Sequence, residues 1–197
     1  DYGVRPLLDA LVKEAPSPQV TAERRGLQAK LDGDTIAQVL KTYFTDKGGR
    51  LSLVRVWQGQ ITDGMTLNGE RIGGIYQLLG QQQIPIQKAN LGQIVALGRI
   101  EKAKTGDTLS NIEKVKSLPK VNNIPPVYAL AIAPDNRKDE VKLSDALTKL
   151  LDEDPSLYWE QHGDTHEVIL WGQGQVHLQV ALDRLRRKYH LPMSTHL

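Results

Sequence analysis

Apolar residues near the start of the chain recur at the spacing of one helical face: Leu7, Leu8, Leu11 and Val12. This periodicity predicts a helix over residues 5–14. Pro16-Ser17-Pro18 is expected to end the helix, because proline lacks an amide donor and disfavours helix in the residue before it. Residues 19–36 are polar and mixed in type, and we interpret them as a linker.

Between about residues 36 and 109 the pattern changes to short β-forming runs separated by glycines. The expected strands are 37–44, 50–57, 60–63, 65–67, 72–79, 93–97 and 108–109. Asn68-Gly69 is a strong hairpin signal, because both residue types accept the positive φ angles of a tight turn. Short strands with turns every ~8–12 residues are typical of closed all-β domains, so this region predicts a barrel.

A third pattern follows a stretch at 110–126 that contains lysines and prolines and predicts a second linker. β-Forming runs lie at 127–133, 157–160, 168–171 and 191–197. Apolar residues at helical spacing occupy two segments between them: Leu143, Ala146, Leu147, Leu150 and Leu151, and then Leu178, Ala181, Leu182, Leu185 and Tyr189. The resulting order, β-α-β-β-α-β, is that of a split βαβ or ferredoxin-like domain.

Composition narrows the possible classes of function. The 197 residues are 40% hydrophobic and 24% charged, and no apolar run approaches the ~20 residues of a membrane span. Cysteine is absent, which excludes disulfides and cysteine–metal clusters. The formal charge of +2 is weaker than a dedicated duplex-binding domain usually carries. Because the chain opens in a helical pattern and ends just after a strand-like run, we expect it to be part of a longer protein.

No sequence motif for catalysis or metal binding is present. The G-x-x-x-x-G-K-[S/T] phosphate loop does not occur, and the five histidines form neither H-x-x-x-H nor H-E-x-x-H. Acidic residues such as Asp63, Asp107 and Asp152 fall in expected turns and helix ends, where carboxylates are usually solvated. We therefore predict no catalytic residue, no metal ligand and no cofactor site in this chain.

The segment Trp171-Gly172-Gln173-Gly174-Gln175-Val176-His177 joins a predicted strand to a predicted helix. Glycine permits positive φ angles and the close approach of another group, and the first amides of a helix can seat a phosphate or carboxylate. The same glycines can equally serve only a tight turn, and His177 can equally be a surface residue or a cap partner. Lys47, Arg50 and Arg71 lie at predicted strand ends or turns, where loops often carry function.

Five segments, in order, resemble the elongation factor G family of translational GTPases. They are the helix and exit from Gly3-Val4 to Pro16-Ser17-Pro18; Arg50-Leu51 with Arg55-Val56, Gly59, Ile61 and Gly64; Thr105-Gly106-Asp107-Thr108-Leu109; Lys142-Leu143-Ser144-Asp145-Ala146-Leu147 with Glu153-Asp154-Pro155; and Gly172-x-Gly174-x-x-His177-Leu178. The resemblance implies the end of a GTPase domain and a linker at 1–28, a Greek-key barrel at 29–118, a linker at 119–123 and a ferredoxin-like third domain at 124–197.

The resemblance also implies a ribosome-binding fragment of a factor that acts in translocation. Its expected partners are small-subunit rRNA and protein and the factor's own GTPase and C-terminal domains, in the cytoplasm or an organelle matrix and not at a membrane. GTP and magnesium are implied only for the longer parent, which is the expected GTPase. Residues expected to face the GTPase domain or the ribosome are Gly172, Gln173, Gly174, Gln175, His177 and Asp154, and those expected to face rRNA are Lys47, Arg50, Arg55 and Arg71.

Several positions depart from the family pattern. Gln173 replaces a methionine, Gln175 and Gln179 replace glutamates, and Asn68-Gly69 shortens a barrel loop. These departures resemble a diverged paralogue and leave full translocase activity open. A release, back-translocation or ribosome-protection factor is an alternative, as is a structural scaffold. A free-standing RNA-binding adaptor shares the β-α-β-β-α-β order, although its strand 167–171 lacks the aromatic pattern of RNA-recognition modules.

Overall fold

The structure, a computed structural model, describes residues 2–27, 30, 33–45, 49–80, 82–163 and 167–196. The chain divides into two compact units. The first comprises Asp1–Gln38, Leu53–Ile100 and Thr108–Ser117, and the second comprises Val39–Ser52, Glu101–Asp107 and Leu118–Leu197. Within the described ranges, no helix is long and apolar enough to span a lipid bilayer.

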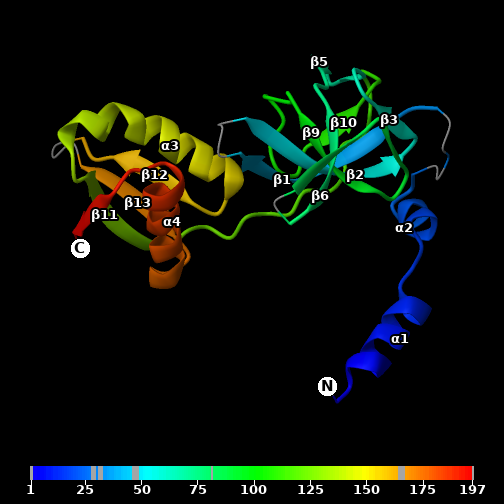
Figure 1. Ribbon diagram of the computed structural model, residues 1–197, viewed down its shortest axis with the longest axis horizontal. Coiled ribbons are helices and arrows are strands. Elements are labelled where there is room, and N and C mark those ends of the chain that lie inside the picture. Colours follow the sequence, from blue (N-terminus) through cyan, green and yellow to red (C-terminus); the bar gives the residue numbers. More distant parts are fainter. Residues whose placement is uncertain are drawn as a thin grey trace. The chain divides into compact units, whose positions relative to one another are not determined.

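Two helices precede the strands of the first unit (Figure 1). Helix α1 (Val4–Glu14) agrees with the predicted helix and buries none of its side chains. Helix α2 (Pro18–Arg24) lies where we predicted a linker, so that part of the linker interpretation is wrong. The reason is local. Ser17 caps α2 by accepting a hydrogen bond from the Val20 amide at 3.4 Å, and Pro18 stands in the first turn, where its missing amide costs little.

Strands β1 to β10 form an all-β Greek-key barrel, as predicted. Their bounds are β1 (Ile36–Phe44), β2 (Arg50–Gln58), β3 (Gln60–Thr62), β4 (Thr66–Leu67), β5 (Glu70–Arg71), β6 (Ile75–Leu79), β7 (Gln82–Ile86), β8 (Lys88–Asn90), β9 (Ile94–Gly98) and β10 (Thr108–Ser110). The main sheet has the order β10-β1-β2-β9-β6-β7, while β3 pairs with β8 and β4 with β5. Because β9 lies between β2 and β6, several neighbours in the sheet are distant in sequence, as in a Greek key.

The predicted Asn68-Gly69 hairpin is present between β4 and β5. Asn68 and Gly69 have φ angles of 49° and 80°, the pair of positive values that a type I′ turn requires. Thr66 then lies opposite Arg71 in the register. Strands β7 and β8 are not predicted by the sequence, because β7 is exposed along most of its length and β8 is only three residues long, so neither shows a readable alternation.

The interior of the first unit is apolar and is built by several strands together. Side chains that are at most 1% exposed include Val54, Val56, Ile61, Leu67, Ile75, Leu97 and Leu109. They come from β2, β3, β4, β6, β9 and β10, so closure of the barrel, and not any single hairpin, removes them from water. Burial of this apolar surface is the main stabilising contribution in such a domain.

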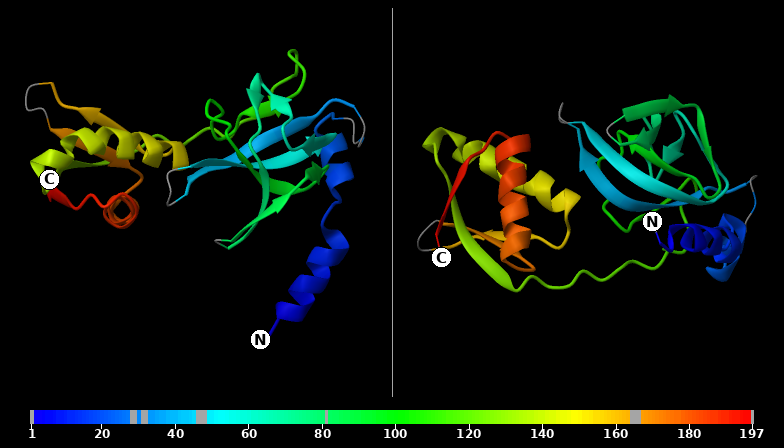
Figure 2. Two further views of the ribbon diagram at one scale, coloured as in Figure 1. Left: turned by 45° about the horizontal axis from the view of Figure 1, so that its top comes forward. Right: turned by 60° about the horizontal axis from the view of Figure 1, so that its bottom comes forward.

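The ferredoxin-like fold makes up most of the second unit, and this prediction is confirmed. Its elements are β11 (Tyr128–Pro134), the short 3₁₀ helix η1 (Arg137–Asp139), α3 (Glu140–Glu153), β12 (Tyr158–Gln161), β13 (Val168–Gly172), α4 (Gln175–Lys188) and β14 (Met193–His196). The antiparallel sheet has the order β12-β13-β11-β14. Helices α3 and α4 cover one face of this sheet (Figure 2).

The core of this fold lies between the helices and the sheet. Leu143, Leu147 and Leu150 of α3 and Leu178 and Leu185 of α4 are buried in one apolar cluster. These residues belong to the two helical faces that the sequence predicts. Packing of these residues therefore holds α3 and α4 together in one core.

Candidate functional site at the start of helix α4

Gly172 is the last residue of β13 and lies tightly against the first turns of α4. It pairs with Tyr128 across the sheet, and its carbonyl accepts a hydrogen bond from the Val127 amide at 2.9 Å. A Cβ atom at this position would lie 2.6 Å from Leu178 Cδ2 and 3.0 Å from His177 Nδ1. The position therefore requires glycine because a neighbouring side chain occupies the space, one of the two reasons that the sequence suggested.

Gly174 plays a different part in the same turn. Its φ and ψ angles of 166° and 176° are extended, and a Cβ atom added there would meet nothing within 4 Å. Its carbonyl accepts the Leu178 amide at 3.1 Å, which is the first hydrogen bond of the helix. Neither space nor backbone strain requires glycine here.

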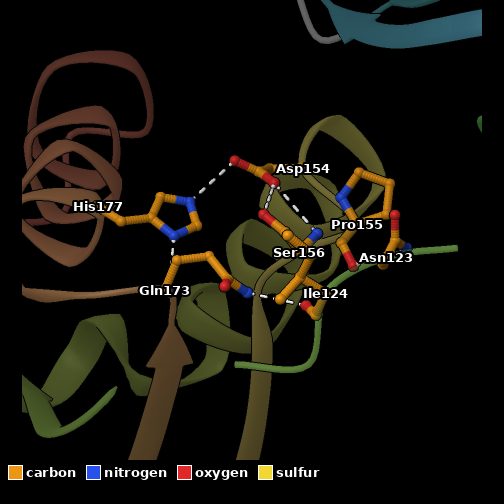
Figure 3. Close-up of polar contacts among 7 residues, drawn as sticks. All are labelled: Asn123, Ile124, Asp154, Pro155, Ser156, Gln173 and His177. Atoms are coloured by element: carbon orange, nitrogen blue, oxygen red, sulfur yellow. Dashed lines mark hydrogen bonds and ion pairs between the residues drawn. The ribbon is translucent and has the colours of Figure 1, made fainter. Parts of the chain in front are cut away.

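His177 connects this turn to the end of α3 (Figure 3). Its Nδ1 atom accepts a hydrogen bond from the Gln173 backbone amide at 3.0 Å, and its Nε2 atom lies 3.1 Å from Asp154 Oδ2. Because an amide can only donate, Nδ1 carries no proton, so the imidazole is the neutral tautomer that donates from Nε2 to Asp154. The hydrogen bonds fix the tautomer as well as the orientation of the ring.

Asp154 caps the end of α3 and is held by the turn that follows it. Its Oδ1 atom accepts hydrogen bonds from the Ser156 amide at 3.1 Å and from Ser156 Oγ at 2.5 Å. Partial burial by itself raises the pKa of Asp154, but the hydrogen bonds from Ser156 and His177 together outweigh it and hold the pKa below its ordinary value. Asp154 is thus an ionised acceptor for both neighbours at neutral pH.

Two further hydrogen bonds connect the segment before β11 to the α4 turn and to the residue after Asp154. The Gln173 side chain donates from Nε2 to the Ile124 carbonyl at 2.8 Å, and Asn123 Nδ2 donates to the Pro155 carbonyl at 3.1 Å (Figure 3). Sequence reasoning did not single out Asn123, Ile124 or Ser156. Their contribution was not readable because two of these contacts use backbone carbonyls, which carry no residue signature.

The structure brings together most of the residues expected to face the GTPase domain or the ribosome. Gly172, Gln173, Gly174 and His177 form one turn, and Asp154 reaches it from α3. Gln175 does not join the network. It lies exposed in the first turn of α4 beside the exposed Val176. The functional role of these residues stays a prediction.

This arrangement positions the chain and does not suit acid–base or nucleophilic chemistry. An Asp–His pair can orient a catalytic base, but such a base needs a free ring nitrogen near a nucleophile. Here Nδ1 is occupied by the Gln173 amide, and the nearby Ser156 hydroxyl is bonded to Asp154 and not to the imidazole. Among the described residues, no group of three or more histidine or acidic side chains could hold a metal ion.

The four residues expected to face rRNA differ in their surroundings. Lys47 lies outside the described residues. The Arg50 side chain is only 8% exposed, and its Nη1 atom lies 2.7 Å from Asp152 Oδ2 within the second unit. Any contact of Arg50 with RNA would therefore compete with this ion pair. The Arg55 guanidinium stacks 4.3 Å from the centroid of the Trp57 ring. Arg71 is exposed at the end of the β4–β5 hairpin.

Comparison with known proteins finds the same two domains in the same order. The model of elongation factor G domain 2 matches residues 34–112, and that of elongation factor G domain III matches residues 124–196. An elongation factor G-like protein from Synechocystis sp. is 63% identical over 193 residues, which is 98% of this chain and 29% of the relative. Elongation factor G from Ehrlichia chaffeensis is 32% identical over 206 residues, which is 96% of this chain and 30% of the relative.

A solved structure supports the same assignment. A crystal structure of a protein from Thermus thermophilus matches with a TM-score of 0.82 and 31% identity, covering 98% of this chain and 29% of that chain. A Greek-key barrel and a ferredoxin-like domain, matched in this order by the two models, identify a domain pair of translation elongation factors. The chain belongs to the elongation factor G family and carries its second and third domains. It spans 29% and 30% of the length of the two curated relatives.

Proposed function

We propose that this chain is the ribosome-contacting domain pair of a GTP-hydrolysing elongation factor that acts in translocation. The ordered match to domains 2 and III and the 63% identity to an elongation factor G-like protein support this proposal. In this proposal GTP and magnesium bind to a GTPase domain outside this chain, because no phosphate loop occurs in its sequence. The place of action is the cytoplasm or an organelle matrix.

The hydrogen bonds around His177 support a coupling role for the ferredoxin-like domain. They connect the end of α3 to the start of α4. A displacement of the turn therefore moves both helices together. Gln175 and Val176 are exposed in the first turn of α4 and offer side chains to a neighbouring domain or to the ribosome. In this proposal the turn is a contact surface whose conformation is fixed by the hydrogen bonds of His177.

One departure from the family pattern has a structural consequence. Gln173 stands where the family resemblance has methionine, and its side-chain amide donates to the Ile124 carbonyl at 2.8 Å. A thioether cannot donate this hydrogen bond. We therefore assign the chain to a paralogue branch in which the turn carries one additional tie, in agreement with the elongation factor G-like name of the 63% identical relative.

Co-sedimentation tests the ribosomal partner directly. The full-length protein, incubated with ribosomes and a non-hydrolysable GTP analogue, is expected to pellet with the ribosomes in a saturable and salt-sensitive manner. The same assay with GDP gives the nucleotide dependence that translational GTPases require. Absence of saturable pelleting in both nucleotide states would remove the ribosome from the proposal.

The coupling role is tested by His177→Ala in the full-length protein. We expect ribosome-stimulated GTP turnover to fall several-fold, because the turn loses its connection to Asp154. The matched control is Ile132→Val, a core change that costs about 0.5–1.5 kcal/mol and lies outside the turn. If both variants lose stability and keep the same turnover, His177 is only a structural residue.

A further inference from the structure

A hollow on the barrel surface gathers two arginines around a floor made of glycines. It has a volume of about 470 Å³ and is lined by Asp63, Gly64, Arg71, Ile72, Gly73, Gly74, Tyr76 and Arg99. Its residues come from the β3–β4 turn, the β4–β5 hairpin, the segment before β6, β6 itself and the residue after β9. All of them belong to the first unit. Sequence reasoning named only Arg71 among them as a candidate for nucleic-acid contact.

The glycine floor makes room for the side chains that line the hollow. A Cβ atom at Gly73 would lie 2.2 Å from Arg99 Cδ, and one at Gly74 would lie 2.5 Å from Tyr76 Oη. The backbone beneath is fixed, because the Gly73 amide donates to the Gly98 carbonyl at 3.0 Å. Arg99 therefore lies flat against the backbone at this position.

Asp63 strengthens the same floor. Its Oδ1 atom accepts the Gly64 amide at 2.9 Å and the Gly74 amide at 3.0 Å, so one carboxylate oxygen holds two loops together. Across the hollow, Arg71 Nη2 would lie 3.4 Å from a Cβ atom at Gly64. The hydrogen bonds of Asp63 and Gly73 thus fix the backbone that surrounds the hollow and positions its two arginines.

The charge of the hollow is unbalanced. Arg71 and Arg99 supply two positive charges against the single carboxylate of Asp63, which is engaged by amides. Within the part of the chain that the structure describes, neither guanidinium makes an ion pair. Arg99 has a φ angle of 61°, the left-handed region that costs a non-glycine residue roughly 1–2 kcal/mol. Backbone strain of this kind clusters at active sites and ligand clamps.

We propose that Arg71 and Arg99 form a clamp for one backbone phosphodiester of RNA. Guanidinium groups bind phosphate oxygens through paired, charge-assisted hydrogen bonds, and a singly charged phosphodiester neutralises the net charge of this hollow. Phosphate contacts of this type position a protein on RNA without reading its sequence. The RNA assignment rests on the proposed ribosomal function, whereas the anion site rests on the geometry alone.

Dimethyl phosphate, which has the charge of an RNA phosphodiester, tests the anion site on this chain. We expect the side-chain Nε–H resonances of Arg71 and Arg99 to shift together along a saturating curve in an NMR titration. Arg186 on α4, whose side chain is 66% exposed, serves as the internal reference and should show only a shallow linear drift. Equal linear drift at all three arginines would overturn the site.

Two variants separate geometry from charge in the same titration. Arg99→Gln removes a cation and is expected to abolish saturation at Arg71. Gly73→Ala keeps every charge but displaces the Arg99 side chain, and should weaken binding at least about ten-fold, the loss of a hydrogen bond to a charged group. Gly163→Ala, where a Cβ atom meets nothing within 4 Å, is the control and should bind as wild type does. Unchanged binding by Gly73→Ala and Arg99→Gln together would contradict the clamp.

Ribosome binding by the full-length protein tests the RNA assignment. The double variant R71Q/R99Q is expected to bind ribosomes at least about ten-fold more weakly, with a logarithmic salt slope smaller by about one, because both arginines neutralise the same phosphate. R186Q carries a single equivalent charge change on α4 and should keep the wild-type slope. If the double variant binds as wild type does, the hollow does not hold ribosomal RNA even when it binds dimethyl phosphate. If wild-type protein does not bind ribosomes, the proposed function and the RNA partner both fail, while the titration still decides the anion site.

Discussion

The start of α4 and the hollow beside β5 both combine glycines with a side chain that can carry charge, yet their polar groups are used differently. At the start of α4, both ring nitrogens of His177 and both oxygens of Asp154 already have partners within the protein. In the hollow, Arg71 and Arg99 line a space together with three glycines, and neither arginine has an ion pair within the described part of the chain. The polar groups of the first region are therefore satisfied by hydrogen bonds within the protein, whereas the two arginines of the proposed anion site keep donors for a ligand.

This difference predicts where substitutions affect stability and where they affect binding. A closed network of hydrogen bonds contributes to folding, because removing one member leaves a partner unsatisfied. Surface cations without an ion pair contribute little to folding. Three measurements of unfolding free energy can break or sharpen this comparison.

The largest effect is expected for Gly172→Ala. The added Cβ atom would lie 2.6 Å from the fully buried Leu178 side chain, and overpacking of this kind costs about 1–3 kcal/mol. Gly174→Ala, two residues away, adds the same group in open space and should cost less than about 1 kcal/mol, the usual penalty at a helix cap. Urea unfolding with unchanged m-values measures both. Equal losses for the two variants would mean that contact with Leu178 does not set the requirement for glycine.

An intermediate effect with a specific pH dependence is expected for Asp154→Asn. The folded protein holds the pKa of Asp154 below the ordinary value of about 3.9, so the unfolded chain binds the proton more readily. The stabilisation is therefore fully present above about pH 4 and is lost as pH falls through the lower, folded pKa. The gap in unfolding free energy between wild type and variant should be about 1–2 kcal/mol at neutral pH and should shrink below about pH 4.

Asp145→Asn provides the control for this pH profile. Asp145 forms a solvent-exposed ion pair with Lys149 one turn along α3, and its side chain is 68% exposed. Its replacement should change the unfolding free energy by less than about 0.5 kcal/mol. A gap for Asp154→Asn that stays constant down to pH 2 would show that its carboxylate is not the stabilising form.

The smallest effects on stability are expected in the hollow. Arg71→Gln and Arg99→Gln should each change the unfolding free energy by no more than about 0.5 kcal/mol, because neither residue has an ion pair to lose within the described part of the chain. Thermal or urea unfolding at low salt is the measurement. A loss above about 1 kcal/mol for either variant would place the hollow with the start of α4, as a region that supports the fold.

Local patterns were sufficient for much of the fold. The alternating runs predicted the barrel strands except β7 and β8, and two apolar faces predicted α3 and α4, because side-chain periodicity follows from backbone geometry over a few residues. The same local reasoning failed at α2, where Pro16-Ser17-Pro18 both ends one helix and begins another. A proline ends a helix that precedes it and is also favoured in the first turn of a helix that follows it. The motif alone therefore did not decide between a linker and a second helix.

The candidate site was only partly predictable, for a physical reason. The sequence indicated the glycine turn and His177, but the contacts that hold them come from residues far along the chain. Asp154 lies 23 positions before His177, and Ile124 lies 49 positions before Gln173. Arg71 and Arg99 likewise line one hollow although they are far apart in the sequence.

By itself, the sequence determined most of the elements and their order, apart from α2, β7 and β8. It also determined the tight Asn68-Gly69 turn and the absence of cysteine chemistry, since each depends on residue type and short spacing. Tertiary structure alone decided which polar groups are used internally and which are left for a ligand. Arg50 and Arg71 illustrate this outcome: both are arginines at strand ends, yet one is buried beside Asp152 and the other is exposed. Pairing depends on which side chains the folded strands and helices bring within hydrogen-bond distance, and sequence spacing does not encode that distance.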